Sequence, residues 1–312
     1  MEDERGRELI SEPGGVDSPW RLLAYEIGDA AYHMAVDEAL LGSMHSHHGP
    51  PTLRFYGWKR PTLSLGRFQD MVGGQRAGEV ERNVLLGSVD MVRRPTGGRA
   101  VWHGEELTYS LVLSRYHPGL PTSVAGLTRF LATGLAVGLA KMGVWVDVSA
   151  ARSTTMGGRA AACFSMIASG SLVIGGRKLG GNAQICSRGI VLQHGSLRLR
   201  HLRLTDHGRL GGVRKTHPWY RLAQQQMIAS VPLSDLLSPL PCVSVLCSSL
   251  ADGLSTLLGV KWHKGFLTSW ERGMVARLQS SVYSSPTWTW NRRRYEPFPC
   301  GYERCWSGLS KV

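Results

Sequence analysis

The segment from residue 171 to residue 199 constrains the fold of this chain most strongly, because it places several strand patterns close together. It begins with SLVIGGRKLGGNAQI over 171–185. There, Gly175-Gly176 suits the two-residue turn of a β-hairpin, whose central residues need positive φ. GIVLQHGSLRL, over 189–199, follows as another strand. A chain with such a segment is built on a β-sheet.

Further strands and helices are expected on either side of this segment. Alternating or aromatic-rich runs predict strands, and apolar residues at helical spacing predict helices. The expected strands are 52–58, 62–68, 87–93 and 108–114, and the expected helices are 29–44, 122–143, 219–229, 243–260 and 269–283. Asp29 is the expected N-cap of the first helix, and Thr122 or Ser123 that of the second. The sequence therefore predicts an α/β (α+β) protein with a mixed, mostly antiparallel sheet flanked by helices.

The chain of 312 residues is long enough for two domains. No segment between residues 20 and 290 has the composition of a linker, so we expect one large domain over 19–295. Residues 1–18 contain Glu, Asp, Gly, Pro and Ser with little that is apolar, and are expected to form a flexible N-terminal tail. Residues 296–312 are expected to form a C-terminal tail.

The longest apolar run, FLATGLAVGLA at 130–140, is too short to cross a membrane. It has 11 residues and is closed by Arg129 and Lys141, whereas a membrane helix needs about 20. We expect a buried helix in which Gly134 and Gly138 allow close packing. The acidic, polar start MEDERGRE lacks the basic and apolar regions of a signal peptide, so a cytoplasmic protein is expected.

Cysteines and histidines give only weak indications of a metal site. The six cysteines include two C-x4-C pairs, Cys242/Cys247 and Cys300/Cys305, whose spacing is longer than zinc sites usually have. HSHHGPP at 45–51 has three histidines within four residues, and we interpret it as a solvated helix breaker. We therefore expect no metal and reduced cysteines.

The chain carries a formal net charge of +13, from 36 lysines and arginines against 23 aspartates and glutamates. Such an excess indicates an acidic partner, which could be nucleic acid, an anionic surface or an acidic protein. The charge alone does not choose among these three.

Residues 93–110, RRPTGGRAVWHGEELTYS, combine the end of a strand with a basic glycine turn. Gly97 and Gly98 let the backbone approach a ligand closely. Their N–H groups, together with Arg93 and Arg94, suit an anionic or carbonyl-bearing group. Most basic Gly-Gly turns are simply turns, so this motif alone is weak evidence for a site.

A cysteine and a lysine flank the start of the predicted hairpin. Cys163 precedes Lys178 by fifteen residues, and a nearby ammonium lowers the pKa of a thiol and makes it a nucleophile. From composition alone, a buried structural cysteine beside a surface lysine is favoured. His194, in the strand after the hairpin, could line a pocket, but by itself it would be an ordinary strand histidine.

Together and in this order, these segments resemble the lipoate–protein ligase and octanoyltransferase family, which shares its fold with biotin–protein ligases. The motifs that carry the resemblance are MAVDEALL (34–41), LRFYGW (53–58), LSLGRFQ (63–69), RRPTGGRAVWH (93–103), GRKLGGNAQ (176–184), LQHGSL (192–197) and WERGMVARL…TWNRR (270–293). The resemblance implies a catalytic domain of the class II aminoacyl-tRNA synthetase and biotin–protein ligase type over 19–295.

Two features within the resemblance point to octanoyltransferases of the LipM type. The ATP-dependent ligases usually read Gly-Gly-Gly at the first motif, whereas this chain has Arg99 at the third position. LipM-type enzymes also have a cysteine just before the lysine hairpin, and Cys163 stands at the matching position. The chain departs from its relatives at 180–184, which read Gly-Gly-Asn-Ala-Gln instead of the commoner Gly-Ser-Ala-Gln. We expect this change to reshape the acyl pocket.

The resemblance implies an octanoyltransferase of lipoate biosynthesis that needs no cofactor. Cys163 would take the octanoyl group from octanoyl-acyl carrier protein as a thioester, with Lys178 favouring the thiolate. The acceptor would be a lysine of a lipoyl domain, such as the glycine-cleavage H protein or an E2 subunit. The implied substrate-binding residues are Arg93, Gly97, Gly98, His103, Gln184 and His194, with both histidines as pocket walls rather than bases.

Three alternatives stay open at this point. An ATP-dependent lipoate–protein ligase and a lipoyl or octanoyl amidotransferase share the fold. A nucleic-acid-binding module would account for the charge, but the arginines at 292–294 are too short a cluster for a recognition helix. In an octanoyltransferase, we expect the charge to serve the docking of acidic carrier and lipoyl proteins, with neither nucleic acid nor membrane as partner.

Overall fold

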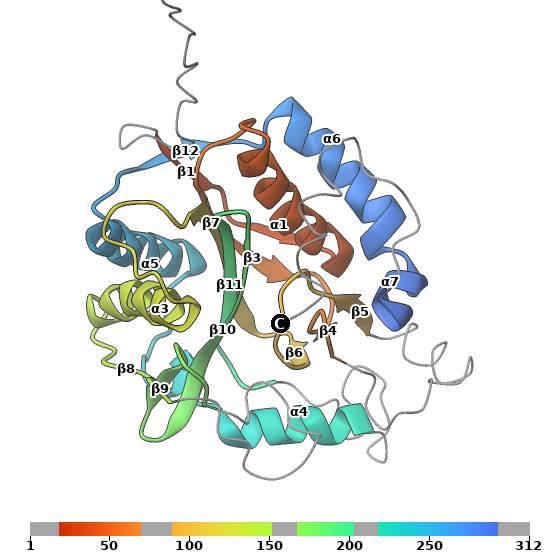
Figure 1. Ribbon diagram of the computed structural model, residues 1–312. Coiled ribbons are helices and arrows are strands. Elements are labelled where there is room, and N and C mark those ends of the chain that lie inside the picture. Colours follow the sequence, from red (N-terminus) through yellow and green to blue (C-terminus); the bar gives the residue numbers. More distant parts are fainter. Residues whose placement is uncertain (1–18, 70–88, 152–166, 203–217, 293–312) are drawn as a thin grey trace, which may run out of the picture.

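The computed structural model describes residues 19–69, 89–151, 167–202 and 218–292, so both predicted tails lie outside the described residues. Two β-sheets and the helices around them make up this part of the chain (Figure 1). The larger sheet has the strand order β12-β1-β3-β7-β11-β10-β9-β8, with β2 paired beside β3. Its strands are β1 (Trp20–Leu23), β2 (Glu26–Gly28), β3 (Thr52–Trp58), β7 (Glu106–Ser114), β8 (Asp147–Val148), β9 (Leu172–Ile174), β10 (Arg177–Ser187), β11 (Ile190–Arg198) and β12 (Trp262–Gly265).

Antiparallel pairing holds the middle of the larger sheet together. β7, β11 and β10 form an antiparallel ladder, whereas β1 pairs in parallel with β3 and with β12. The smaller sheet has the order β5-β4-β6, with β4 parallel to β5 and antiparallel to β6. Its strands are β4 (Thr62–Leu65), β5 (Asp90–Arg93) and β6 (Val101–His103). The expected mixed, mostly antiparallel α/β architecture is confirmed.

Helices cover both faces of the larger sheet (Figure 1). α3 (Val124–Ala140) and α5 (Val243–Leu258) lie on one side, which we call the α3 face. α1 (Ala30–His45) lies on the other side, the α1 face, with α6 (Ser269–Leu278) packed against it. α4 (Pro218–Ala229) runs along one end of the molecule near β9 and β6, and α7 (Pro286–Asn291) packs against β5.

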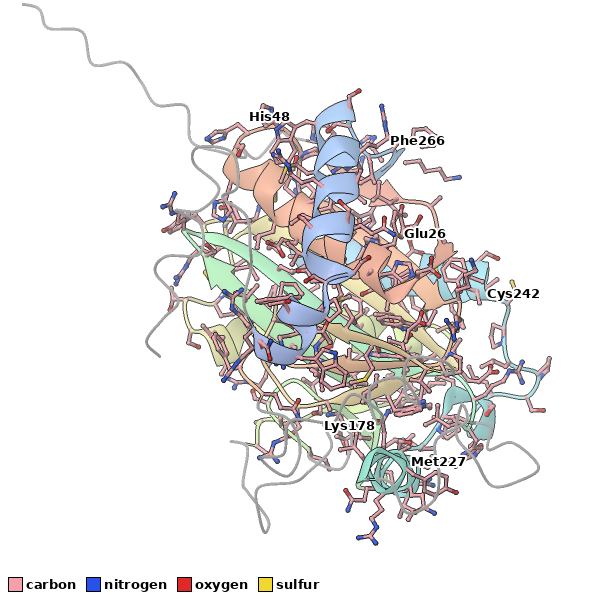
Figure 2. All side chains as sticks on the ribbon, turned by 90° about the vertical axis from the view of Figure 1, so that its right-hand side faces the viewer. Glu26, His48, Lys178, Met227, Cys242 and Phe266 are labelled. Atoms are coloured by element: carbon pink, nitrogen blue, oxygen red, sulfur yellow. The ribbon has the colours of Figure 1, made fainter. Side chains whose placement is uncertain are left out.

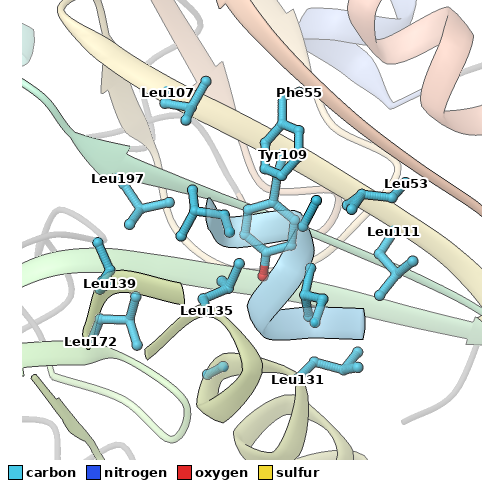
Figure 3. Packing of buried hydrophobic residues seen from close by; sticks show 14 of the residues in the cluster. Leu53, Phe55, Leu107, Tyr109, Leu111, Leu131, Leu135, Leu139, Leu172 and Leu197 are labelled. Atoms are coloured by element: carbon cyan, nitrogen blue, oxygen red, sulfur yellow. The ribbon is translucent and has the colours of Figure 1, made fainter. Parts of the chain in front are cut away.

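Each face of the sheet buries its own apolar core. On the α3 face, Tyr109 of β7 belongs to one cluster with Leu135 of α3 (Figure 3). On the α1 face, Val112 of β7 and Leu192 of β11 belong to a second cluster with Leu40 of α1. Because successive side chains of a strand point to opposite faces, each residue of β7, β10 and β11 belongs to one face or the other. This alternation decides which side chains can share a site.

α3 and α5 cross so closely that glycine is required at the crossing. A methyl group on Gly253 of α5 would overlap the carbonyl oxygen of Gly134 and the nitrogen of Gly138. Ser249 of α5 donates a hydrogen bond from Oγ to the Gly138 carbonyl at 2.7 Å. The expectation of a buried, closely packed helix at 130–140 is therefore confirmed. Among the helices of the described residues, none has the length and apolar character needed to span a membrane.

Local signals in the sequence placed several elements correctly. β3 has the predicted bounds 52–58, and the predicted hairpin turns at Gly175 and Gly176, whose φ values are 55° and 73°. Ser123 caps α3, because its Oγ accepts a hydrogen bond from the Gly126 N–H at 3.0 Å. Each of these features depends on a few neighbouring residues, which is why sequence patterns can predict it.

Other elements differ from the prediction. The strand expected over 62–68 ends at Leu65, and the helix expected over 269–283 is α6 followed by a π-helical turn, Gln279–Tyr283. Asp29 stands at the N-cap of α1, but its side chain makes no capping hydrogen bond. The prediction omits β1, β2, β6, β8 and β12, whose two to four residues are too few to show a periodic pattern.

Candidate active site

A pocket lies on the α1 face, where α1, β3, β6, β10 and β11 meet. Aromatic and aliphatic side chains supply much of its wall, and two histidines belong to it. The lining residues are Met34, Tyr56, Trp58, Arg94, Val101, His103, Thr108, Gly181, Asn182, Ala183, His194, Gly195 and Ser196. The fold therefore brings together His103 and His194, which the sequence singled out in separate motifs.

His194 is held between a carboxylate and a hydroxyl. Its Nδ1 donates to Oδ2 of Asp37 at 3.0 Å, and its Nε2 accepts from Oγ1 of Thr96 at 2.6 Å. Burial would raise the pKa of the Asp37 carboxyl, but the hydrogen bond from His194 and the charge of Arg54 hold that pKa below its usual range. The ionised carboxylate can only accept a hydrogen bond, so it fixes the ring proton of His194 on Nδ1.

His103 has the same arrangement with different partners. Its Nδ1 contacts Oε1 of Glu106, and its Nε2 accepts from Oγ of Ser64 at 2.5 Å. Burial would raise the pKa of Glu106, but the neighbouring His103 and the charge of Arg198 keep it low. Trp58 stacks on the His103 ring with 4.1 Å between the ring centroids. Glu106 thus fixes the proton of His103 on Nδ1, as Asp37 does for His194.

Both histidines are neutral at pH 7. Burial lowers the pKa of each ring, and the adjacent carboxylate offsets this effect only in part. The hydrogen bonds to Asp37 and Thr96, and to Glu106 and Ser64, use both nitrogens of each ring. The rings therefore present carbon atoms to the pocket, and such a wall suits an apolar chain.

Arg94 supports the glycine turn from inside. Its Nη1 donates to the carbonyl oxygen and Oγ of Ser64, at 3.0 and 2.6 Å. Its Nη2 donates to the carbonyl oxygens of Gly97 and Arg99, at 3.1 and 2.9 Å. These bonds pull the carbonyl groups of the turn toward the guanidinium and hold the turn in one shape. A contact between Arg94 and an anionic or carbonyl-bearing ligand stays a prediction.

Arg93 and the turn glycines lie beside the pocket rather than in its wall. Arg93 is buried and donates to the carbonyl oxygens of Gly66 and Thr289, at 2.7 and 3.0 Å. Gly98 has a φ of 89°, which favours glycine, and a methyl group on Gly66 would overlap its carbonyl. A methyl group on Gly97 would meet none of the described atoms within 4 Å. Substrate contacts for Arg93, Gly97 and Gly98 stay predictions.

Lys178 and Gln184, both on β10, point to opposite faces of the sheet. Lys178 is only 2% exposed and lies beside Gly181 of the pocket wall. Oε1 of Gln184 instead accepts a hydrogen bond from Oγ1 of Thr128 in α3 at 2.5 Å. The structure therefore places the end of Lys178 beside the pocket wall and turns the side chain of Gln184 to the opposite face. A substrate contact for Gln184 stays a prediction.

Asn182, the unusual residue of the 180–184 segment, also directs its side chain to the α3 face. Its Oδ1 accepts from the hydroxyl of Tyr109 at 2.7 Å, and its Nδ2 donates to the carbonyl of Gly170 at 2.8 Å. The polar end of Asn182 is thus occupied on the side of the sheet away from α1. An effect of this residue on the pocket must come through its main chain.

Cys163, the predicted nucleophile, lies outside the described residues. The cysteines that are described are Cys186, Cys242 and Cys247, and none of these three lines the pocket. Within the described ranges, His, Cys, Asp and Glu side chains form no cluster of three or more that could hold a metal ion.

The buried charges around the histidines are the part of the site that sequence reasoning missed. Arg54 donates from Nη1 to Oδ1 of Asp37 at 3.1 Å and from Nη2 to Nδ1 of His33 at 2.8 Å. A signal for this cluster existed in the MAVDEALL motif, where two carboxylates stand among small and aliphatic residues. An acid with apolar neighbours on every side of a helix is buried, and a buried acid needs a partner.

Comparison with known proteins identifies the family of this chain. A family model described as the lipoyl protein ligase A/B catalytic domain matches residues 29–205. The chain belongs to this family. A relative from Kyrpidia tusciae, named octanoyltransferase LipM, is 37% identical over 291 residues, which is 88% of this chain and 99% of the relative. A protein of the same name from Bacillus subtilis is 30% identical over 282 residues, 88% of this chain and 98% of the relative.

Solved structures of lipoate–protein ligases share the fold of this family member. Lipoate-protein ligase A bound with ATP gives a TM-score of 0.68 at 21% identity and covers 88% of this chain and 99% of the other. A bipartite lipoate protein ligase from Thermoplasma acidophilum gives 0.67 at 22% identity, with 90% and 99% covered. At these identities the likeness shows the fold alone. The family membership that the motifs implied is confirmed.

Proposed function

We propose that this family member is an octanoyltransferase that moves an octanoyl group from octanoyl-acyl carrier protein to a lysine of a lipoyl domain. The observation that carries the activity is the near full-length match to relatives named octanoyltransferase LipM. The enzyme is then an acyltransferase of lipoate biosynthesis. The carrier-bound donor and the acceptor, such as the glycine-cleavage H protein or an E2 subunit, belong to the proposal.

In the first step, the thiolate of Cys163 attacks the carbonyl carbon of the octanoyl thioester. The bond between that carbon and the sulfur of the carrier breaks, the carrier sulfur takes up a proton, and Cys163 holds the octanoyl group as a new thioester. An ammonium near a thiol lowers its pKa, which is the part we assign to Lys178. One thioester replaces another, so the step is nearly balanced in energy and needs no ATP.

In the second step, the neutral amine of the acceptor lysine attacks the Cys163 thioester. A carbon–nitrogen bond forms, the carbon–sulfur bond breaks, the nitrogen gives up one proton, and Cys163 leaves as a thiolate. An amide is lower in energy than a thioester, so this step drives the overall transfer. Backbone N–H groups are expected to stabilise the oxyanion in both steps.

The pocket on the α1 face supports an acyl substrate. Met34, Val101 and Trp58 offer it apolar surface, and the neutral rings of His103 and His194 offer carbon edges. An eight-carbon chain is stabilised by such a slot because its apolar surface leaves water there. Lys178 lies beside one wall of the slot, next to Gly181, where its charge would act on the thioester end of the chain.

The net charge of +13 supports acidic protein partners for both half-reactions. Long-range attraction between a basic enzyme and acidic carriers raises the encounter rate. We further propose that residues 19–295 form one catalytic domain between short tails. The enzyme is proposed to work in the cytoplasm with no metal or other cofactor, and with neither nucleic acid nor membrane as partner.

Intact-mass measurement tests this function. The protein is incubated with octanoyl-acyl carrier protein, and a mass increase of one octanoyl group is expected, followed by transfer to an added lipoyl domain without ATP. Cys163→Ser is expected to lose both events. If Cys163→Ser acylates the lipoyl domain as fast as the unaltered enzyme, the covalent mechanism is wrong. A requirement for ATP and free octanoate would instead identify an ATP-dependent ligase.

A further inference from the structure

β10 carries one more residue than β9 at the start of the hairpin. Lys178 pairs with Val173, whereas the next pair along the ladder joins Gly180 to Leu172. The register therefore shifts across Leu179, which stands as an extra residue in β10. Such a β-bulge breaks the regular alternation of side chains along a strand.

The faces occupied by these side chains show the effect of the bulge. Leu179 belongs to the core of the α3 face together with Leu172, and a methyl group on Gly180 would also contact Leu172. Two successive residues of β10 thus face α3. The bulge turns Lys178 onto the α1 face, the same face as Gly181.

On that face, the end of Lys178 fills the space where a side chain of Gly181 would begin. A methyl group on Gly181 would lie 2.6 Å from Cε and 2.7 Å from Nζ of Lys178. Gly181 itself lines the pocket, and Lys178 is buried. Gly181 therefore lies next to both the ammonium of Lys178 and the pocket.

The main chain of Lys178 is anchored at the end of α4. The Val231 N–H donates to the carbonyl of Lys178 at 3.1 Å, and the neighbouring Arg177 donates to the carbonyl of Ser230. Figure 2 shows Lys178 at the end of the molecule that carries Met227 of α4, and Phe266 at the opposite end. Because these hydrogen bonds hold the main chain, an overlap with Lys178 would be relieved by movement of its long side chain.

We propose that Gly181 is a positioning residue for Lys178. The absence of a side chain at residue 181, together with the bulge at Leu179, lets the ammonium of Lys178 lie against the pocket wall. The consequence for catalysis rests on the proposed octanoyltransferase function, because in that function Lys178 lowers the pKa of the Cys163 thiol. The placement of the side chain does not rest on it.

Gly181→Ala is expected to displace Lys178 without unfolding the protein. The atoms that a new methyl group would overlap are the far end of a flexible side chain, which moves more easily than backbone. We expect octanoyl transfer to fall roughly 100-fold, the size of effect seen when one stabilising group is lost from an active site. The thermal midpoint should stay close to that of the unaltered protein.

Gly180→Ala is the matched control. Gly180 is the adjacent glycine, but a methyl group there would face the α3 core, at 3.1 Å from the Ser196 carbonyl oxygen and at 3.4 and 3.5 Å from the side chains of Leu172 and Leu197. Substitution at residue 180 leaves the space around Lys178 unchanged. We expect Gly180→Ala to transfer octanoyl at nearly the rate of the unaltered enzyme.

Chemical labelling tests where the side chain of Lys178 lies, independently of enzyme activity. Trace acetic anhydride is added to folded protein, and acetylation of Lys178 is measured by peptide mass spectrometry. Because Lys178 is 2% exposed, it should react slowly in the unaltered protein and in Gly180→Ala. In Gly181→Ala the displaced amine should react several-fold faster. Unchanged labelling of Lys178 in folded Gly181→Ala would overturn the proposal, whatever the activity.

A double substitution separates positioning from a general structural role. If Gly181 acts only through Lys178, Gly181→Ala should cost nothing further in a Lys178→Ala background, since the overlap is gone. Losses that multiply in the double variant, or a double variant that fails to fold, overturn the proposal. If the unaltered enzyme fails to take up octanoyl from the carrier protein, the proposed function fails, and the labelling result still decides the placement of Lys178.

Discussion

Oδ2 of Asp37 accepts a hydrogen bond from Nδ1 of His194 at 3.0 Å, although the two residues lie 157 positions apart in the chain. The same carboxylate accepts from Oγ of Ser110 at 2.6 Å, from the hydroxyl of Tyr56 at 3.2 Å and from Nη1 of Arg54 at 3.1 Å. One side chain of α1 thereby joins the helix to β3, β7 and β11. Asp37 supports both the core of the α1 face and the wall of the pocket.

Asp37→Ala is expected to lower the free energy of unfolding by about 3 kcal/mol. The substitution removes the Asp37 carboxylate from the buried guanidinium of Arg54, which keeps only the carboxylate of Glu26, at 2.8 Å. Loss of one partner of a buried ion pair is strongly destabilising. Urea unfolding at pH 7 measures the change. Asp37→Asn keeps an acceptor for Ser110 and should cost less. Equal stability of all three proteins would contradict this account of the site.

The sequence could predict the elements with local signals but not the support of the pocket. A hairpin turn such as Gly175-Gly176 depends on the conformations open to two residues. The proton of His194, in contrast, is fixed by Asp37, and Nε2 of that ring is bound to Thr96, a residue of a third segment. Such long-range pairs depend on the packing of helices on the sheet, which no local pattern specifies.

The face of the sheet to which Lys178 points is a second feature that the sequence pattern could not predict. Lys178 and Gln184 lie six positions apart, an even number, so regular alternation would put both side chains on one face of the sheet. The bulge at Leu179 puts them on opposite faces. One extra residue in a strand therefore decides which of two predicted site residues lies on the face of the sheet that carries the pocket.

Protonation of His33 is expected to destabilise the protein at acidic pH. Burial, and then the charge of Arg54, lower the pKa of this ring to about 3, whereas a histidine in the unfolded chain ionises near pH ~6.5. Between these values the unfolded chain binds a proton that the folded protein does not. The contribution of neutral His33 to the free energy of unfolding is therefore fully present above pH ~6.5, the pKa of the unfolded chain. It is lost as the pH falls toward about 3, the pKa of this ring in the folded protein.

His33→Gln should reduce this pH dependence. We expect the slope of unfolding free energy against pH, measured by urea titration between about pH 5.5 and about pH 4, to fall by about 1.4 kcal/mol per pH unit. An unaltered slope in His33→Gln would show that the folded protein protonates this ring as readily as the unfolded chain does.

Gly253→Ala should destabilise the crossing of α3 and α5. The new methyl group would overlap backbone atoms of Gly134 and Gly138, so the helices must separate, and overpacking of this kind costs roughly 1–3 kcal/mol. Gly273→Ala on α6 is the control, because a methyl group there meets none of the described atoms within 4 Å. It should stabilise the protein by about 0.5–1 kcal/mol through helix propensity. Thermal unfolding that ranks the two variants in the opposite order would contradict the close crossing.

On the proposed function, octanoyl transfer from the carrier protein is expected to slow as the salt concentration is raised. The net charge of +13 includes exposed cations such as Lys264 and Arg272, which attract an acidic carrier. Salt screens this attraction over a Debye length of about 10 Å at 0.1 M and about 3 Å at 1 M. Between these salt concentrations kcat/KM should fall for octanoyl-acyl carrier protein. A small neutral octanoyl thioester has no charge to be steered, so its kcat/KM should stay nearly constant. Equal salt dependence for both donors would mean that the charge of the enzyme plays no part in docking the carrier.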